Sequence, residues 1–274
     1  DVVKEIAEPY PLKVFPDATF LSRSDFDLSN DASTLPTNFG SFRWVINTAA
    51  FTDVDGAESS SGRKQAWATN VHGLTRLVDA CKREGVGLVH VSSDYVFDGE
   101  SETPYQEADL ASPLGVYGQT KAAGDVLVAS LDRHIIVRTS WVVGDGKNFV
   151  STMKRLAAES KPVTVVEDQV GRLTFTEDLA RALEQLLQKE MLGTFNVSNS
   201  GSEVSWYQIA KKIYEIEGKD TSLVAPVSSA EYFSGASNIA PRPKFSVLSL
   251  EKLEALGILM PDWEESLSRF LERK

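Results

Sequence analysis

The sequence predicts an α/β fold built on a parallel sheet. Short apolar runs alternate with longer amphipathic helical patterns, which is typical of parallel strands joined by crossover helices. The 274 residues suffice for one large α/β domain, or for a large domain with a smaller one attached. A content of 42% hydrophobic and 24% charged residues is ordinary for a globular protein.

Each predicted element follows from its pattern. Apolar, β-branched runs bounded by polar turns predict strands at 43–47, 86–94, 133–141 and 162–167. Helical periodicity predicts helices at 63–84, 148–160 and 176–190, and a further helix that follows the turn at Pro113. Turn residues and charge at 95–113 predict a long surface loop, and loops of this length in compact domains are usually functional or disordered.

The beginning of the chain does not follow this alternation. The runs "LKVF" (12–15) and "ATFLS" (18–22) both resemble strands, yet only Pro16 and Asp17 separate them. Neighbouring parallel strands need a crossover of a dozen or more residues, usually a helix. The sequence therefore suggests that a loop and a helix have been lost between Phe15 and Pro16.

Charge and cysteine content exclude several classes of protein. A net charge of −11 and a pI near 4.9 argue against a nucleic-acid or anionic-membrane partner. The single cysteine, Cys81, excludes an intrachain disulfide framework and a cysteine-rich metal site. No membrane-length apolar run and no signal pattern is present, so we expect a cytoplasmic location. The three histidines (72, 90 and 134) are too scattered for a metal site, and each is interpreted as a packed or surface residue.

The most informative stretch is "PLGVYGQTKAAGD" (113–125). Tyr117 and Lys121 lie four residues apart, so on a helix both side chains share one face. The preceding strand ends in Ser92 and Ser93, at the carboxyl edge of the sheet, where α/β proteins bind ligands. A hydroxyl, a phenol and an ammonium group that meet there would suit proton delivery to a carbonyl, and Lys121 would lower the pKa of the phenol.

Several blocks together carry a family resemblance. They are "VINTAAFTDVDGAE", "ATNVHG", "VHVSSDYVFDG", "SPLGVYGQTKAAGD", "RTSWVVG", "NFVSTM", "VEDQVGRLTFTEDLA" and "PRPKFSVLSLEKL". In this order the chain resembles the dTDP-4-dehydrorhamnose reductases, which are extended short-chain dehydrogenases/reductases. It is most similar to the reductase module that some bacteria fuse behind a dTDP-sugar 3,5-epimerase. Residues 1–11 would then be the remnant of an interdomain linker.

The resemblance implies a Rossmann-like, doubly wound parallel sheet with a smaller C-terminal α/β substrate domain. The NAD(P)-binding domain would cover residues 12–145, with 162–192 contributing to it. The substrate-binding region would comprise 146–161 and 193–274. The implied partners are a dTDP-sugar and, fused or associated, the 3,5-epimerase, with no nucleic acid and no membrane.

The resemblance also implies the reaction. NADPH, or alternatively NADH, would reduce the C4 keto group of dTDP-4-dehydro-6-deoxy-L-mannose, giving dTDP-L-rhamnose. Tyr117 would supply the proton, Lys121 would hold the nicotinamide ribose, and Ser93 would bind the carbonyl. In this superfamily the residues after the strand resemble Thr-Asp-Glu in the dehydratases, whereas this chain has the reductase-like sequence "SSDYVF".

Further site residues follow from the same comparison. The implied cofactor-binding set, besides Tyr117 and Lys121, is Arg23, Ser24, Asp27, Leu28, Thr48, Ala49, Ala50, Asn70 and Ser92. Arg23 and Ser24 would accommodate a 2′-phosphate, which favours NADPH, although a solvated surface arginine explains Arg23 nearly as well. The implied substrate-binding set is Asp94, Tyr95, Trp141, Asn148, Arg172 and Arg242, with no metal. Loop packing is a serious alternative for Tyr95, and surface solvation is one for the arginines.

One expected motif is absent from the sequence. The family carries Gly-x-x-Gly-x-x-Gly after its first strand, where backbone N–H groups hold the pyrophosphate, and these 274 residues contain no such motif. Three explanations are open: a mobile segment missing from the sequence, a trimmed chain, or a natural variant. We favour the first, because removing the helix would strip many contacts from the sheet. If the chain is a natural variant without this motif, we expect neither tight NAD(P) binding nor reductase activity.

Two other functions are compatible with the active-site pattern. The regulatory β subunit of methionine adenosyltransferase is similar to this family, so a catalytically silent NADP-binding subunit is one alternative. Trp141 and "DQVGRLTF" favour a working reductase over that alternative. The second alternative is an epimerase or dehydratase of the extended short-chain dehydrogenase/reductase family, and the "SSDYVF" residues disfavour this alternative.

Overall fold

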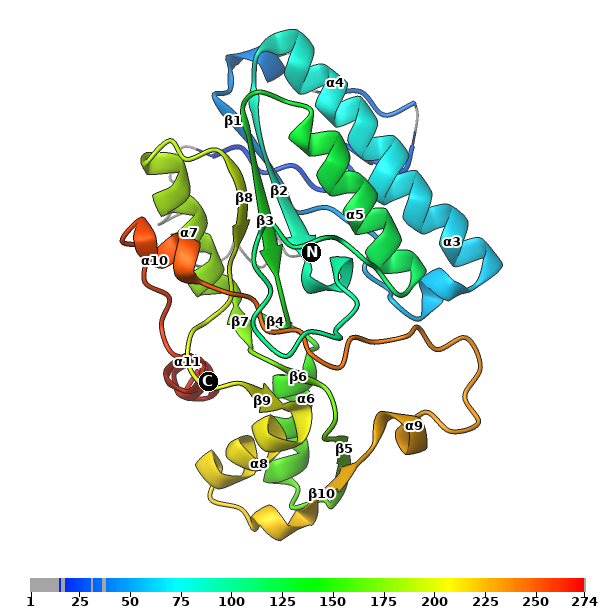
Figure 1. Cartoon of the computed structure of the whole chain (residues 1–274), viewed down its shortest axis with the longest axis vertical. Coiled ribbons are helices and arrows are strands. Elements are labelled where there is room, and N and C mark those ends of the chain that lie inside the picture. The colour runs from blue at the N-terminus through cyan, green and yellow to red at the C-terminus, as the bar shows by residue number, and fades with distance from the viewer. Residues whose placement is uncertain (1–14, 16–17, 31, 36–37, 274) are drawn as a thin grey trace.

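A parallel sheet forms the centre of the protein (Figure 1). The computed structural model describes residues 15, 18–30, 32–35 and 38–273. The sheet has the order β1-β2-β3-β8 and all its strands are parallel. Its strands are β1 (Trp44–Asn47), β2 (Gly87–Ser93), β3 (His134–Thr139) and β8 (Gly193–Asn196). The predicted α/β class with a parallel sheet is therefore confirmed.

Helices cover both faces of this sheet, as Figure 1 shows. One face carries α3 (Ser60–Trp67), the π-helical turn η3 (Ala68–Gly73), α4 (Leu74–Glu84) and α5 (Val116–Ala129), and the other carries α7 (Thr176–Gln188) and α10 (Glu251–Ala255). Strand alternation explains this arrangement, because Leu88 packs with α4 while its neighbour Val89 packs with α7. Helix α4 ends at Gly85, whose φ of 69° is the left-handed conformation that glycine adopts without strain.

A second, smaller part lies at the carboxyl ends of the strands. It contains α6 (Phe149–Ala158), α8 (Trp206–Ile216) and α11 (Trp263–Leu271), and the parallel pair β5 (Val163–Val166) and β10 (Val224–Val227). Tyr214 and Trp263 are almost fully buried in its core. Two short strand pairs, β4 (Val142–Val143) with β7 (Thr174–Phe175) and β6 (Val170–Gly171) with β9 (Val204–Ser205), lead into it.

The remaining elements are short. They are η1 (Phe39–Ser41), η2 (Gly56–Glu58), η4 (Asp94–Val96), η5 (Thr221–Leu223) and α9 (Ser229–Tyr232). The predicted surface loop 95–113 is partly internal: Phe97 and Tyr105 stack at 4.2 Å between ring centroids and are buried. No helix of the described residues is long and apolar enough to cross a membrane.

At two strands the observed pairing differs from the expected division of the chain. β8 lies within 193–274, yet it extends the central sheet beside β3. β5 lies within 162–192, yet it pairs with β10 in the smaller part. Both strands are short apolar runs, and a local pattern does not specify the partner of such a run. The expected domain limits otherwise stay a proposal.

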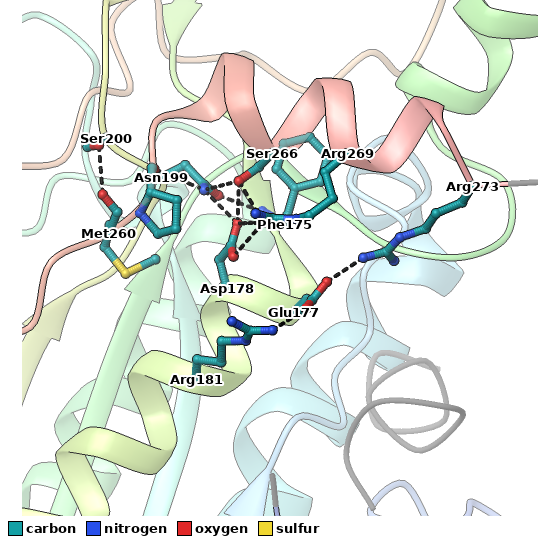
Figure 2. Close-up of polar contacts among 11 residues, drawn as sticks. Phe175, Glu177, Asp178, Arg181, Asn199, Ser200, Met260, Ser266, Arg269 and Arg273 are labelled. Atoms are coloured by element: carbon teal, nitrogen blue, oxygen red, sulfur yellow. Dashed lines mark hydrogen bonds and ion pairs between the residues drawn. The ribbon is translucent and has the colours of Figure 1, made fainter. Parts of the chain in front are cut away.

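A buried polar cluster connects the C-terminal helix α11 with α7 (Figure 2). The carboxylate of Asp178, in the first turn of α7, accepts hydrogen bonds from Asn199 Nδ2 at 2.8 Å and Ser266 Oγ at 2.6 Å. Arg269 Nη2 on α11 donates to the same carboxylate at 2.8 Å. The neighbouring Glu177 pairs with Arg181 and Arg273. Since the Asp178 side chain is 1% exposed, the pairing offsets the cost of burying its charge.

Strand β1 forms an edge of the sheet among the described residues, beside an apolar cavity of about 770 Å³. Trp44 and Ile46 line it from the sheet, Leu183 and Leu187 from α7. The predicted strand at 18–22 is wrong. Within the described part of the chain this segment pairs with no strand, and several of its residues line the cavity. A turn in which Ala18 N donates to Phe15 O at 3.1 Å leaves no room for a crossover between parallel strands.

Two other expectations concern the start of the chain. The predicted linker 1–11 and most of the predicted strand 12–15 lie outside the described residues. In the sequence Phe15 directly precedes Pro16, and the three explanations for the absent glycine-rich segment stay open.

Candidate active site

The end of β2 and the start of α5 bring the predicted catalytic residues together. Ser93, 7% exposed, is the last residue of β2, and its hydroxyl donates to Asp94 Oδ1 at 2.9 Å. Tyr117 lies in the first turn of α5, where Val116 N donates to the Glu58 carboxylate at 2.8 Å. The Ser93 side chain lies close enough to the Tyr117 phenol to affect its pKa. A hydroxyl and a phenol therefore meet at the carboxyl edge of the sheet, as the sequence predicts.

A glycine sets the distance between these two elements. A Cβ on Gly118 would lie 2.1 Å from the carbonyl oxygen of Tyr95, which no real side chain tolerates. Without it, α5 packs directly against the backbone that follows Ser93. The rings of Tyr95 and Tyr117 then meet edge to face, with centroids 5.5 Å apart.

The pKa of Tyr117 differs from the sequence-based expectation. Burial raises this pKa well above its ordinary value, the polar side chain of Ser93 opposes the rise, and the charge of Asp94 adds to it. Lys121 does not depress the pKa here because its amine is directed elsewhere. Its Nζ donates to the carbonyl of Val91 at 2.6 Å and lies 3.2 Å from His90 Nε2. The phenol of this structure is therefore a protonated acid at neutral pH.

Lys121 and Asp94 are buried ionisable groups in the same cluster. Lys121 is 2% exposed, and burial lowers its pKa to about 8, against the charge of Asp125. Asp94 is 3% exposed, and burial raises its pKa to about 6, although hydrogen bonds from Ser93 and Ser246 oppose the rise. Perturbed groups gathered at a sheet edge mark a candidate active site.

The loop after β1 approaches this cluster through Asn70. Its Oδ1 accepts from Phe51 N at 2.7 Å, and its Nδ2 donates to Thr120 Oγ1 on α5 at 2.9 Å. Asn70 thus ties the loop to the helix that carries Tyr117, from within the π-helical turn η3. Thr48 in the same loop has a buried hydroxyl with no hydrogen-bond partner among the described residues. Ala49 and Ala50 complete the small-residue loop.

The predicted adenosine-binding residues lie on a surface turn. The side chain of Arg23 is 80% exposed and pairs with Asp27 at 3.0 Å. The hydroxyls of Ser24 and Ser22 lie 2.6 Å apart, also exposed. Leu28 is buried, and its carbonyl oxygen would lie 2.1 Å from a Cβ on Gly73, so the turn packs closely on η3. The Arg23 and Ser24 side chains are therefore exposed, and they contact neighbouring residues of the same turn.

The predicted substrate-binding residue Trp141 has a strained backbone. It follows β3 and has a φ of 46°, in the left-handed region that a bulky residue rarely adopts. Its ring stacks on Trp206 at 3.8 Å between centroids and lies against Gly171, where a Cβ would come within 2.7 Å. Strain of this kind concentrates at functional sites.

Arg242 reaches the cluster from the C-terminal part. Its Nη2 lies 2.8 Å from Asp55 Oδ2, and its side chain hydrogen-bonds the phenol of Tyr95. Asp55 also accepts from Ala240 N at 3.0 Å. Asp55 makes no side-chain cap hydrogen bond to η2, and Ser59 caps α3.

Two other predicted substrate residues are placed differently. Asn148 caps α6, since its Oδ1 accepts from Ser151 N at 2.9 Å and its Nδ2 donates to Gly144 O at 2.7 Å. Arg172 is 8% exposed, and its Nε has no hydrogen-bond partner among the described residues. Burial lowers the pKa of Arg172, with the charges of Glu203 and Glu254 opposing. The structure thus gives Asn148 a structural role and leaves Arg172 as a buried cation.

Comparisons with known proteins agree with this architecture. The family profile described as the RmlD substrate binding domain matches residues 16–274. The chain belongs to the RmlD family. It is 38% identical over 248 residues to the spore coat polysaccharide biosynthesis protein SpsK of Bacillus subtilis, covering 89% of this chain and 84% of that protein. It is 41% identical over 236 residues to a dTDP-4-dehydrorhamnose reductase of Mycobacterium tuberculosis, covering 83% and 75%.

A solved RmlD-family structure has the same fold. The dTDP-4-dehydrorhamnose reductase of Bacillus anthracis, crystallised in complex with NADP, superposes with a TM-score of 0.86 and 34% identity. The match covers 100% of this chain and 95% of that one. The predicted resemblance to these reductases and the Rossmann-like, extended short-chain dehydrogenase/reductase fold are confirmed.

The RmlD-family site fits a nicotinamide cofactor at one end. The unpartnered Thr48 hydroxyl and the small Ala49 and Ala50 lie at the end of β1, and Lys121 is buried nearby on α5. These residues suit a ribose and a flat ring. No glycine-rich turn for the pyrophosphate occurs in the sequence. Among the described residues no group of three or more His, Cys, Asp or Glu side chains could hold a metal ion.

Sequence reasoning missed two members of the site in this RmlD-family chain. Asp55 could not be found, because its partner Arg242 lies 187 residues away. His90 was interpreted as a packed or surface histidine, yet it contacts Lys121. Strand alternation contained a signal for it, since His90 and Ser92 share one face of β2 and α5 covers that face.

Proposed function

We propose that the chain is an NADPH-dependent reductase of a sugar nucleotide. It reduces the C4 keto group of dTDP-4-dehydrorhamnose (dTDP-4-dehydro-6-deoxy-L-mannose) and yields dTDP-L-rhamnose, as the names of its relatives imply for them. NADPH is favoured over NADH by the NADP complex of the similar structure and by the exposed Arg23. The observation that carries the proposal is that Ser93 at the end of β2 and Tyr117 in the first turn of α5 come together at the carboxyl edge of the sheet.

The residues supply a proton and a fixed geometry. Ser93 donates a hydrogen bond to the ketone oxygen, and the Tyr117 hydroxyl transfers its proton to that oxygen as C4 gains a hydride. The C4–O double bond becomes a C–OH single bond, and Tyr117, left as a phenolate, recovers its proton from solvent. The raised pKa of Tyr117 keeps the phenol protonated before the transfer. Lys121, when charged, stabilises the phenolate.

The cofactor supplies the hydride and becomes oxidised. Thr48, Ala49, Ala50 and Lys121 would hold its nicotinamide ribose, and Arg23 with Ser24 its adenosine phosphate. On the sugar-nucleotide side, Asp94, Tyr95 and Trp141 are proposed to border the sugar, and Arg172 and Arg242 to lie toward the diphosphate. Asn148 caps α6 and binds the carbonyl of Gly144, so it would affect the substrate only by holding this loop in place.

The test has a binding arm and a turnover arm. NADPH binding is measured by fluorescence titration of the full chain, and turnover by NADPH oxidation with dTDP-4-dehydrorhamnose. Tyr117→Phe should bind NADPH unchanged and lower kcat by about 100-fold or more. Tyr207→Phe is the matched control, since Tyr207 lies on α8 and packs against the core of the smaller part. A folded chain that does not bind NADPH would overturn the proposal. NADPH binding without turnover would support the silent regulatory subunit instead.

Two finer features belong to the proposal. A dTDP-sugar 3,5-epimerase, fused or associated, is proposed as partner because such an enzyme forms the 4-keto substrate. A cytoplasmic location is proposed because dTDP-sugars and NADPH are cytoplasmic metabolites. Co-purification of the chain with an epimerase from its own cells would support the first, and cell fractionation would test the second.

A further inference from the structure

A buried hydrogen-bonded row connects β1, β2 and α5. Asn47 and His90 are paired neighbours in the register of β1 and β2, and both are at least 95% buried. Asn47 Nδ2 lies 3.0 Å from His90 Nδ1, and His90 Nε2 lies 3.2 Å from Lys121 Nζ. Gly124 lies beside this row, since a Cβ there would come 3.3 Å from Asn70 O and 3.4 Å from His90 Nε2. The row therefore ends at a proposed catalytic residue.

The orientation of the Asn47 amide fixes which nitrogen of His90 carries a proton. Asn47 Oδ1 accepts a hydrogen bond from Ala49 N at 3.2 Å, so its Nδ2 is the atom that faces the imidazole. An amide nitrogen only donates, and His90 Nδ1 must therefore accept. Burial holds the pKa of His90 well below its ordinary value, so the ring is neutral. A neutral ring that accepts at Nδ1 carries its hydrogen at Nε2.

The hydrogen at Nε2 points at Lys121. An ammonium group has three donors and no lone pair, so it cannot accept this hydrogen, whereas a neutral amine can. Lys121 Nζ also donates to Val91 O at 2.6 Å, which a neutral amine can do at the same time. Both contacts are satisfied together only by the uncharged lysine.

Both protonation states of Lys121 are accessible near neutral pH, because burial lowers its pKa to about 8. Asp125, on the same helix, is the charged group that favours the ammonium form, and Arg138 on β3 pairs with it at 3.0 Å. Three other ionisable side chains belong to neighbouring elements. Tyr117 on α5 is a neutral phenol. Asp94 lies on η4, and the Glu58 carboxylate on η2 accepts a hydrogen bond from the start of α5. The four residues of β1 contain no titratable group.

We propose that His90 is a positioning residue, which favours the neutral amine form of Lys121 through an Nε2–H···Nζ hydrogen bond in a tautomer set by Asn47. This rests on the proposed function for its catalytic meaning, since a lysine held neutral cannot stabilise the Tyr117 phenolate. Lys121 must leave His90 and gain a proton before it assists Tyr117. The row Asn47–His90–Lys121 thus keeps Tyr117 a weak acid until Lys121 leaves His90 and becomes charged.

The tautomer of His90 is measurable without turnover. With ¹⁵N-histidine labelling of the full chain, His90 should show an unprotonated Nδ1 and a protonated Nε2. His134 is an internal control of the opposite kind, because its Nδ1 lies 2.5 Å from the carbonyl of Leu131, an acceptor, and so carries the hydrogen. The chain has only three histidines, and His90→Gln assigns the signals. A wild-type His90 protonated at Nδ1 would overturn the proposal.

Asn47→Asp tests the control by Asn47. A carboxylate in this position accepts from Nδ1–H, so the tautomer should reverse and Nε2 should accept from an ammonium. The Lys121 pKa, followed by the ¹³Cε signal of labelled lysine, should then rise from about 8 toward 10.5. An Asn47→Asp chain with unchanged His90 nitrogens and unchanged Lys121 titration would refute the proposal. If the NMR results hold and NADPH oxidation is absent, only the proposed function fails.

Discussion

Arg242 and Asp55 join the C-terminal segment to the loop beyond β1, with Nη2 and Oδ2 2.8 Å apart. The same guanidinium hydrogen-bonds Tyr95 and lies over the ring of Phe233 at 4.8 Å. The pair therefore positions Tyr95, whose ring contacts Tyr117.

Arg242→Ala should lower kcat/KM by about 10-fold or more, because it releases Tyr95 as well as the C-terminal segment. Asp55→Ala should lower it less, and the double variant should match Arg242→Ala, since Asp55 acts through the arginine. Effects on stability should stay below about 1 kcal/mol, because the Asp55 side chain is 40% exposed. The exposed pair Arg155–Glu159 is the control and should change neither quantity. Additive losses in the double variant would contradict this coupling.

Asp94 should make stability depend on pH. Its pKa is raised from 3.8 to about 6 by burial, so the folded state holds this proton more tightly than the unfolded state. The group therefore favours folding below pH 3.8, and this contribution is lost as the pH rises through about 6. Asp94→Asn should be more stable than the wild type at neutral pH by up to about 3 kcal/mol, and close to it at about pH 4. Urea unfolding at the two pH values measures this, and an equal difference at both would contradict it.

The polar cluster in Figure 2 should contribute strongly to the free energy of unfolding, because it attaches the C-terminal helix α11 to α7. Asp178→Ala leaves the Asn199 and Ser266 donors buried without their acceptor, so we expect a loss of about 3–5 kcal/mol in the free energy of unfolding. Arg181→Ala removes only a pair whose arginine is 57% exposed and should cost less than about 1 kcal/mol. Denaturant unfolding compares the two variants. Similar small losses in both would show that the cluster does not clamp α11.

Gly118→Ala should damage the site although alanine favours helices. The new Cβ would lie 2.1 Å from the carbonyl oxygen of Tyr95, a backbone atom that cannot rotate away. α5 must then shift from β2, and kcat should fall by about 10-fold or more with the displaced Tyr117. Gln119→Ala, at an exposed position of the same helix, should leave kcat unchanged. An active Gly118→Ala chain would mean that the contact adjusts without cost.

The sequence contained the proposed catalytic arrangement because that arrangement depends on local pattern. The four-residue spacing of Tyr117 and Lys121 fixes their shared helix face, and the position of Ser93 at the end of an apolar run fixes it at the sheet edge. Contacts between distant segments could not be predicted, among them Asp55 with Arg242. Local pattern also failed at 18–22, where an apolar run is extended but has no strand partner in the described residues.

The stacked indoles of Trp141 and Trp206 connect the end of β3 with α8, at 3.8 Å and an interplanar angle of 16°. Two such chromophores at this separation couple electronically, and their excited states split. The chain therefore contains an intrinsic optical reporter: the coupled ultraviolet circular dichroism of the pair exists only while the two parts stay in register. Any rotation of α8 away from the sheet edge would change that spectrum without a label.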